Sequence, residues 1–186
     1  MAEPGARVRS VQVPDESRAA RAYAATDLAD AYAIRLPDGA SREPEQLARF
    51  IFAQGSPAVA ALLWLRDALV AGFGLKTSRR LAGVPGQPNP GRIGLFKIYA
   101  TYADEIVMGE DDKHLDFRVS VLRRPTTPAA QGPADLILST VVHCHNRLGR
   151  VYIFVIGPFH RAIVRSYLRR AARAGWPQQL PAGATR

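Results

Sequence analysis

The stretch HLDFRVSV, residues 114–121, decides the fold class, because polar and apolar side chains alternate strictly along it. Alternation with a period of two is typical of a β-strand that covers one face of a core. The apolar face carries Leu115, Phe117, Val119 and Val121. The polar face carries His114, Asp116, Arg118 and Ser120. The apolar row predicts the core-facing side of a sheet.

Further strand-like runs lie on both sides of this stretch. They are Ala29–Leu36, Leu95–Tyr102, Glu105–Met108 and Leu136–His145, each bounded by polar or turn residues. The short connections between the later runs favour an antiparallel sheet. Asn146-Arg147-Leu148-Gly149 predicts a hairpin turn with Gly in the left-handed conformation. It leads to a strand at Val151–Ile156, whose wholly apolar sequence predicts cover on both faces.

Helical periodicity appears in three places. Pro44 suits a first helical position, and Leu47, Phe50 and Ile51 share one face of a short helix that ends by Gly55. Ser56 and Pro57 open a second, apolar helix that stops near Gly72. A loop rich in Pro and Gly is expected over residues 76–94. Gly157-Pro158 opens a long C-terminal helix with a solvated basic stripe of Arg161, Arg165, Arg169 and Arg173.

Length and charge limit the classes of protein that the chain can form. Its 186 residues fit one domain over residues 27–176, with an N-terminal arm over 1–26 and a flexible tail over 177–186. The net charge of +9 is spread along the chain without interleaved aromatic residues, so nucleic acid is not the expected partner. The longest apolar run, Ala58–Leu65, is too short for a membrane span, and no secretory signal precedes it. A cytoplasmic location is expected, with Cys144 as a buried apolar residue.

The polar row on the first strand supplies the candidate catalytic residues: His114, Asp116 and Arg118. If the row lines a cavity, Asp116 can orient the imidazole of His114 and tune it for acid–base chemistry. Two other interpretations stay open. The row can face solvent, as half-exposed strands do, or Asp116 can simply neutralise Arg118 in a structural pair.

A second group of residues is assigned to ligand binding: Glu105, His143, His145, Tyr152 and His160. His143 and His145 share a strand face, a spacing that could hold a metal ion, but no third ligand is evident and no metal is expected. Glu105 belongs to an acidic turn region that could lie at the mouth of a cavity. His160 falls in the first turn of the predicted last helix, where the helix dipole disfavours its charged form.

Several short motifs occur in a family-specific order. They include Arg66-Asp67, Phe73-Gly74-Leu75, Gly94-Leu95-Phe96, the run from Asp112 to Arg118, Thr140-Val141-Val142-His143, Asn146 with Gly149, and Pro158-Phe159-His160. In these motifs the chain resembles the bacterial family of domain of unknown function 2867, from about Ala29 to Arg173. The order of elements also resembles the helix-grip superfamily of START lipid-transfer domains, polyketide cyclases and pollen-allergen-like proteins (SRPBCC). This resemblance implies an α+β helix-grip fold, an antiparallel sheet wrapped around a long C-terminal helix, with two short helices after the first strand.

The resemblance carries no established activity with it. Some relatives follow a domain that binds a nicotinamide cofactor, but this chain has no Gly-x-Gly-x-x-Gly sequence, and no cofactor is expected. The resemblance implies a hydrophobic small molecule bound in an apolar cavity, with cofactor-independent cyclase, dehydratase or isomerase chemistry on a carbonyl compound as the expected activity. The alternatives are a non-catalytic carrier or sensor, and an interaction module that forms a homodimer through Val151–Ile156.

Overall fold

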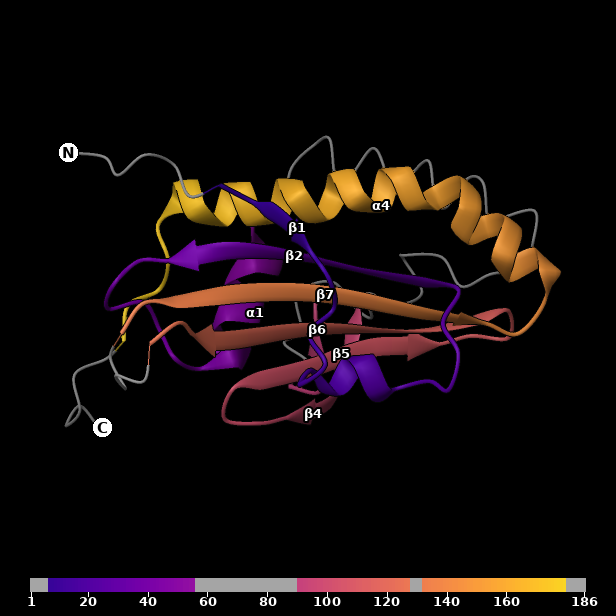
Figure 1. The fold of residues 1–186 in the computed structure, drawn as a ribbon, viewed down its shortest axis with the longest axis horizontal. Helices are drawn as coiled ribbons and strands as arrows, with labels where there is room; N and C mark the ends of the chain where they lie inside the picture. The colour runs from indigo at the N-terminus through magenta and orange to yellow at the C-terminus, as the bar shows by residue number, and fades with distance from the viewer. Residues whose placement is uncertain (1–6, 56–89, 128–131, 180–186) are drawn as a thin grey trace.

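The computed structural model describes residues 7–55, 90–127 and 132–179. The strands in these ranges form a single antiparallel sheet. Within these ranges the strands are β1 (Arg9–Val11), β2 (Leu28–Leu36), β3 (Arg92–Ile93), β4 (Phe96–Thr101), β5 (Glu105–Asp111), β6 (Leu115–Pro125) and β7 (Ala134–Cys144). Their order across the sheet is β1-β2-β7-β6-β5-β4-β3. The helices are η1 (Arg18–Arg21), α1 (Pro44–Ala53) and α4 (Arg147–Ala174). Figure 1 shows α4 running along the β2 side of the sheet.

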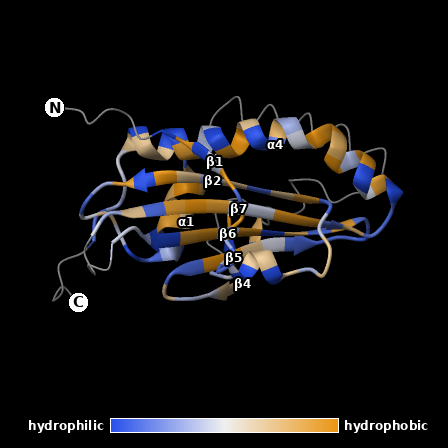
Figure 2. Ribbon diagram, in the orientation of Figure 1, coloured by the Kyte–Doolittle hydropathy of each residue, from blue (hydrophilic) through white to orange (hydrophobic). Residues whose placement is uncertain are grey.

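The two faces of the sheet are covered by different parts of the chain. On the inner face, Val119 and Val121 of β6 pack in one cluster with Leu47 of α1 and Leu168 of α4. On the outer face, a smaller apolar cluster joins β2, β6 and β7 to the N-terminal segment: Ala31, Ala33, Leu122, Ile137, Val11 and Val13. Figure 2 shows the matching hydropathy, with long apolar stretches in the central strands and mixed polarity along α4. The predicted core face of residues 115–121 is therefore confirmed.

Most of the expected elements are present, with boundaries shifted by a few residues. The antiparallel arrangement and the helix from Pro44 are confirmed. The first predicted strand, Ala29–Leu36, corresponds to β2. The second helix, near residues 56–72, and most of the 76–94 loop lie outside the described residues. At the end of that predicted loop the chain forms the short strand β3 instead, paired with β4.

The predicted hairpin at 146–149 and the strand at 151–156 are wrong, because both stretches belong to α4. Asn146 is the N-cap of this helix, and its side-chain oxygen accepts a hydrogen bond from the backbone N–H of Gly149 at 3.1 Å. A Cβ on Gly149 would lie 2.4 Å from the carbonyl oxygen of His114, so Gly is required by close packing rather than by a turn. The helix therefore begins ten residues before Gly157-Pro158.

Residues 151–159 are helical despite their apolar sequence and their proline. Pro158 lies inside α4, where it cannot donate a backbone hydrogen bond, and the helix bends in its N-terminal half (Figure 1). The side chains of Val151, Phe154, Val155 and Phe159 are exposed, at 59%, 84%, 45% and 38%. The strand through which a homodimer was expected does not exist, so dimerisation stays a prediction without that contact.

The N-terminal arm is part of the folded domain. β1 pairs with β2, and η1 lies over the outer face of β6 and β7. At the other end of the chain, Gln179 donates its backbone N–H to the carbonyl of Gly39, and Ser41 donates to the carbonyl of Pro177. In their described parts, the expected arm is therefore attached to the sheet, and the expected tail is attached to the connection between β2 and α1. No described helix is long and apolar enough to cross a membrane.

Candidate functional site

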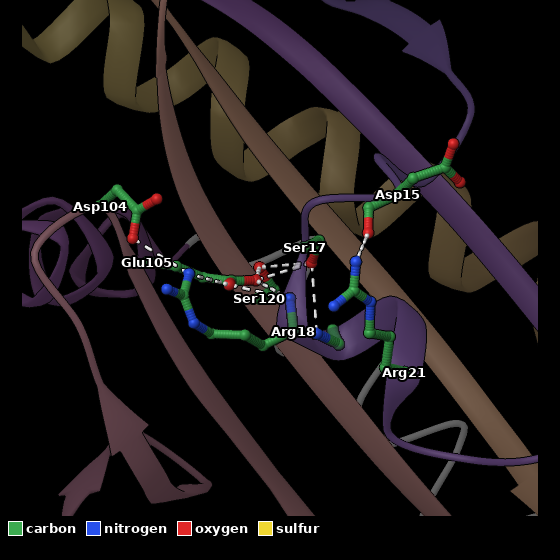
Figure 3. A network of polar contacts seen from close by, with 8 residues as sticks. Asp15, Ser17, Arg18, Arg21, Asp104, Glu105 and Ser120 are labelled. Atoms are coloured by element: carbon green, nitrogen blue, oxygen red, sulfur yellow. Dashed lines mark hydrogen bonds and ion pairs between the residues drawn. The ribbon is translucent and has the colours of Figure 1, made fainter.

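The outer face carries a fully enclosed carboxylate, Glu105 of β5 (Figure 3). Ser17 donates its hydroxyl to this carboxylate at 2.6 Å, and Ser120 of β6 donates a second hydroxyl. The backbone N–H of Arg18 lies 2.9 Å from Oε2 of Glu105, and the Arg18 guanidinium lies 3.2 Å from the same atom. Burial alone would raise the pKa of Glu105, but these hydrogen bonds outweigh it and hold the pKa below its usual value.

Glu105 is therefore not placed at the mouth of a cavity, as the sequence suggested. Its side chain is 0% exposed and its oxygens already accept hydrogen bonds from the N-terminal segment and from β6. The Arg18 guanidinium also stacks 3.9 Å from the centre of the Tyr102 ring. This arrangement attaches residues 17 and 18 to the sheet, which is a structural role. Sequence reasoning missed Ser17 and Arg18, because they lie 88 and 87 residues from Glu105 along the chain.

Arg118 also lies on the outer face and is neutralised by a neighbouring strand. Its Nη1 donates to the carboxylate of Asp111 at 2.7 Å, and its guanidinium stacks 3.7 Å from the centre of the Tyr99 ring. Tyr99 donates its hydroxyl to the other oxygen of Asp111 at 2.8 Å. Burial, followed by the hydrogen bond to Asp111, raises the pKa of Tyr99 to about 12. Arg118 therefore pairs with Asp111, and the anticipated pairing with Asp116 is not the one observed.

Asp116 orients a histidine, but the histidine is His145 rather than His114. Nε2 of His145 lies 2.9 Å from Oδ2 of Asp116, and this hydrogen bond raises the pKa of His145. His143 lies beside it, with 5.6 Å between ring centroids, and Nδ1 of His143 donates to the carbonyl of Ala25 at 2.9 Å. The two histidines share a face as predicted, and no group of three potential metal ligands occurs among the described residues.

His114 occupies the junction between β6 and the start of α4. Its Nδ1 accepts a hydrogen bond from the side-chain amide of Asn146 at 3.0 Å, and its carbonyl accepts from the backbone N–H of His145 at 2.9 Å. Its Nε2 is buried and has no hydrogen-bond partner in the described part of the chain. The predicted catalytic row is thus divided, with Asp116 and Arg118 on the outer face and His114 beside the N-cap of α4.

A different group of polar side chains lies on the inner face, between the sheet and α4. Asp30 of β2 is paired across the strands with Thr140 of β7. From α4, Nε2 of His160 approaches one oxygen of Asp30 at 3.4 Å, and Nε of Arg161 approaches the other at 3.6 Å. The Asp30 side chain is only 11% exposed. These residues bring a carboxylate, a hydroxyl and an imidazole together under the helix.

The polar atoms of this inner group form no hydrogen bonds with the residues that the structure describes. Among those residues, both carboxylate oxygens of Asp30, Oγ1 of Thr140 and Nε2 of His160 are buried without a hydrogen-bond partner. Buried polar atoms are nearly always hydrogen-bonded in folded proteins, so a cluster without partners indicates a place where another molecule can bind. His160 lies in the middle of α4, so the predicted effect of a helix N-terminus on its charge does not apply.

Tyr152 is also on α4, where it packs against the apolar cluster of Leu115, Val142 and Cys144. Cys144 is buried as predicted, and burial together with the neighbouring carboxylate of Asp27 raises the pKa of its thiol to about 11. A thiol with this pKa is a poor nucleophile near neutral pH.

Sequence reasoning missed Asp30 and Thr140, although a signal for Asp30 was present. Side chains alternate between the two faces of a strand, so Asp30 shares a face with the apolar residues Tyr32, Ile34 and Leu36. A charged residue on a core face requires a partner or a function, so Asp30 could have been predicted as a candidate functional residue from the sequence.

The described residues form an α+β protein with one antiparallel sheet, a long C-terminal helix on its inner face and, beneath that helix, a polar cluster without hydrogen bonds among these residues. The chain belongs to the family described as Protein of unknown function (DUF2867), which matches residues 22–167. This confirms the resemblance to that family and covers the sheet from β2 onward, but not Ser17 and Arg18. A search of curated proteins finds no match to the chain.

Proposed function

We propose that this protein adopts the helix-grip arrangement and binds a small, largely apolar molecule between the inner face of the sheet and α4. The observation that carries the proposal is the inner cluster of Asp30, Thr140 and His160, whose buried polar atoms form no hydrogen bond with the described residues. Asp30 has only the longer ion-pair contacts with His160 and Arg161. Leaving such an atom unsatisfied costs about 1–3 kcal/mol, so a ligand that supplies hydrogen bonds here gains affinity. A molecule with a hydroxyl or similar donor group fits the carboxylate and hydroxyl oxygens.

Aromatic side chains on the same face support an apolar body for this ligand. Phe52 of α1 lies edge-on to Phe96 of β4 and to Tyr167 of α4, with ring centroids 5.0 and 5.6 Å apart. Phe96 in turn meets Phe117 of β6 at 5.9 Å. All four rings are only partly buried. Aromatic walls with a few polar groups are typical of small-molecule sites.

The positions of the titratable groups favour a carrier or sensor over an enzyme. Asp116 and Arg118 face away from α4 and are engaged by His145 and Asp111, so they do not reach a ligand held on the inner face. The cyclase, dehydratase or isomerase expected from the sequence would need its proton-transfer group in the inner layer. His160, with Nε2 3.4 Å from a carboxylate oxygen of Asp30, is the residue positioned for that alternative.

The test uses a fluorescent probe that resembles the inferred ligand. We expect saturable binding of 2-naphthol, followed by its fluorescence, and binding of 2-methoxynaphthalene that is at least about tenfold weaker because its oxygen cannot donate a hydrogen bond. Asp30→Asn and Thr140→Val should each weaken 2-naphthol binding by about tenfold.

Asp15→Asn is the matched control, since Asp15 is an exposed carboxylate in the N-terminal segment, which packs on the outer face of the sheet. It should bind 2-naphthol as the unmodified protein does. Equal affinity for the two naphthalenes, or unchanged affinity in Asp30→Asn, would show that the inner cluster does not bind a donor group.

A further inference from the structure

A pocket of about 310 Å³ opens at the far end of β2, away from Asp30. Its walls come from the turn after β2, the ends of β6 and β7, and the C-terminal segment, through Leu36, Gly39, Arg42, Arg123, Ala134 and Gln179. Asp30 and Leu36 are separated by six residues of extended strand, about 20 Å. The pocket is therefore distinct from the inner cluster.

Two arginines line this pocket without an anionic partner among the described residues. Arg123 lies two residues after Val121 on β6, so both are on the core-facing side of the strand, and Arg123 is paired with Leu136 of β7. Its Nε is buried, and none of the described residues hydrogen-bonds to it. Arg42 belongs to the turn before α1 and is half-buried. Neither guanidinium forms an ion pair in the described part of the chain, whereas Arg9, Arg18, Arg35, Arg49, Arg92, Arg118, Arg124, Arg150 and Arg161 all do.

The environment of Arg123 is unfavourable for a cation in the absence of a ligand. Burial, and then the positive charge of Arg42, lower the pKa of Arg123. Two like charges held together in a concave site repel each other, and an anion placed between them removes the repulsion. Asp38 also lines the pocket, and its side chain is exposed.

We propose that this pocket binds a small oxyanion, held by the guanidinium groups of Arg42 and Arg123. The planar fork of an arginine matches the paired oxygens of a carboxylate or a phosphate group, so both kinds of anion present the required chemistry. The volume is at the lower end of ligand pockets, which restricts the ligand to a small organic acid or a phosphate. The net charge of +9 adds a long-range attraction for anions.

The test is isothermal titration calorimetry of the full chain at low ionic strength, with inorganic phosphate and succinate as separate probes. We expect saturable binding of at least one of them, and the tighter probe identifies the kind of oxyanion that the pocket prefers. Arg123→Gln and Arg42→Gln should each raise the Kd by at least about tenfold, because each removes a charged hydrogen-bond donor.

Arg124→Gln is the matched control, since Arg124 is adjacent in sequence but exposed and paired with Glu16. It should bind the anion as the unmodified protein does. In buffer without anions, Arg42→Gln should keep or raise the Tm, because it relieves the repulsion on Arg123, and this shows that the variant is folded. The proposal is overturned if neither probe binds saturably, or if Arg124→Gln weakens binding as much as Arg42→Gln does.

Discussion

Two buried carboxylates, one on each face of the same sheet, have opposite surroundings. Glu105 on the outer face accepts hydrogen bonds from two serine hydroxyls, a backbone N–H and a guanidinium. Asp30 on the inner face accepts none from the described residues, and Nε2 of His160 and Nε of Arg161 lie 3.4 and 3.6 Å from its oxygens. A carboxylate whose oxygens are satisfied holds the fold together, whereas one that is left open can receive a ligand.

The largest effect on the free energy of unfolding is expected when the carboxylate of Glu105 is removed. Glu105→Ala should lower the free energy of unfolding by about 3 kcal/mol, because it leaves buried donors from Ser17, Ser120 and Arg18 without an acceptor. Urea denaturation followed by circular dichroism measures this change. A loss below about 1 kcal/mol would contradict the structural role assigned to Glu105.

Low pH should reduce the free energy of unfolding by protonating the same carboxylate, Glu105. The pKa of Glu105 is lower in the folded protein than the value near 4.5 of an unfolded glutamate, so the unfolded state binds the proton first as the pH falls. The stabilisation is complete above about pH 4.5 and is lost as the pH falls through the lower, folded pKa. Urea denaturation at a series of acidic pH values should therefore show a steeper loss in the unmodified protein than in Glu105→Gln. Parallel curves for the two proteins would exclude Glu105 as the source.

The smallest effect on stability is expected at Asp30. Asp30→Asn removes a buried charge that accepts no hydrogen bond from the described residues, so the free energy of unfolding should change by less than about 1 kcal/mol, even though 2-naphthol binding weakens about tenfold. Denaturation and fluorescence titration of the same preparation measure both quantities. A loss of stability as large as that of Glu105→Ala would mean that Asp30, too, is a structural group.

The sequence could predict the sheet because period-two alternation depends on neighbouring residues alone. Leu115, Phe117, Val119 and Val121 faced the core as expected, and the first strand and the helix from Pro44 were found for the same reason. The alternation could not show which face α4 covers. Asp116 and Arg118 were therefore assigned to a possible cavity, although they lie on the opposite face from the helix.

The error at residues 146–156 came from a pattern that two structures share. Asn followed three residues later by Gly suits a hairpin turn, but it also suits a helix whose Asn caps the N–H of that Gly. An apolar run of six residues does not distinguish a buried strand from a helix. The close approach of Gly149 to the His114 carbonyl, which is a tertiary contact, favours the helix.

The bond between Ser17 and Glu105 also has a consequence for the order of events during synthesis and folding. These residues are 88 positions apart, so the N-terminal segment emerges long before its acceptor exists. The main partner of β2 is β7, which emerges later still. The outer layer formed by β1 and η1 therefore closes at a late stage, and the outer face of β6 and β7 stays uncovered in every folding intermediate that lacks this contact.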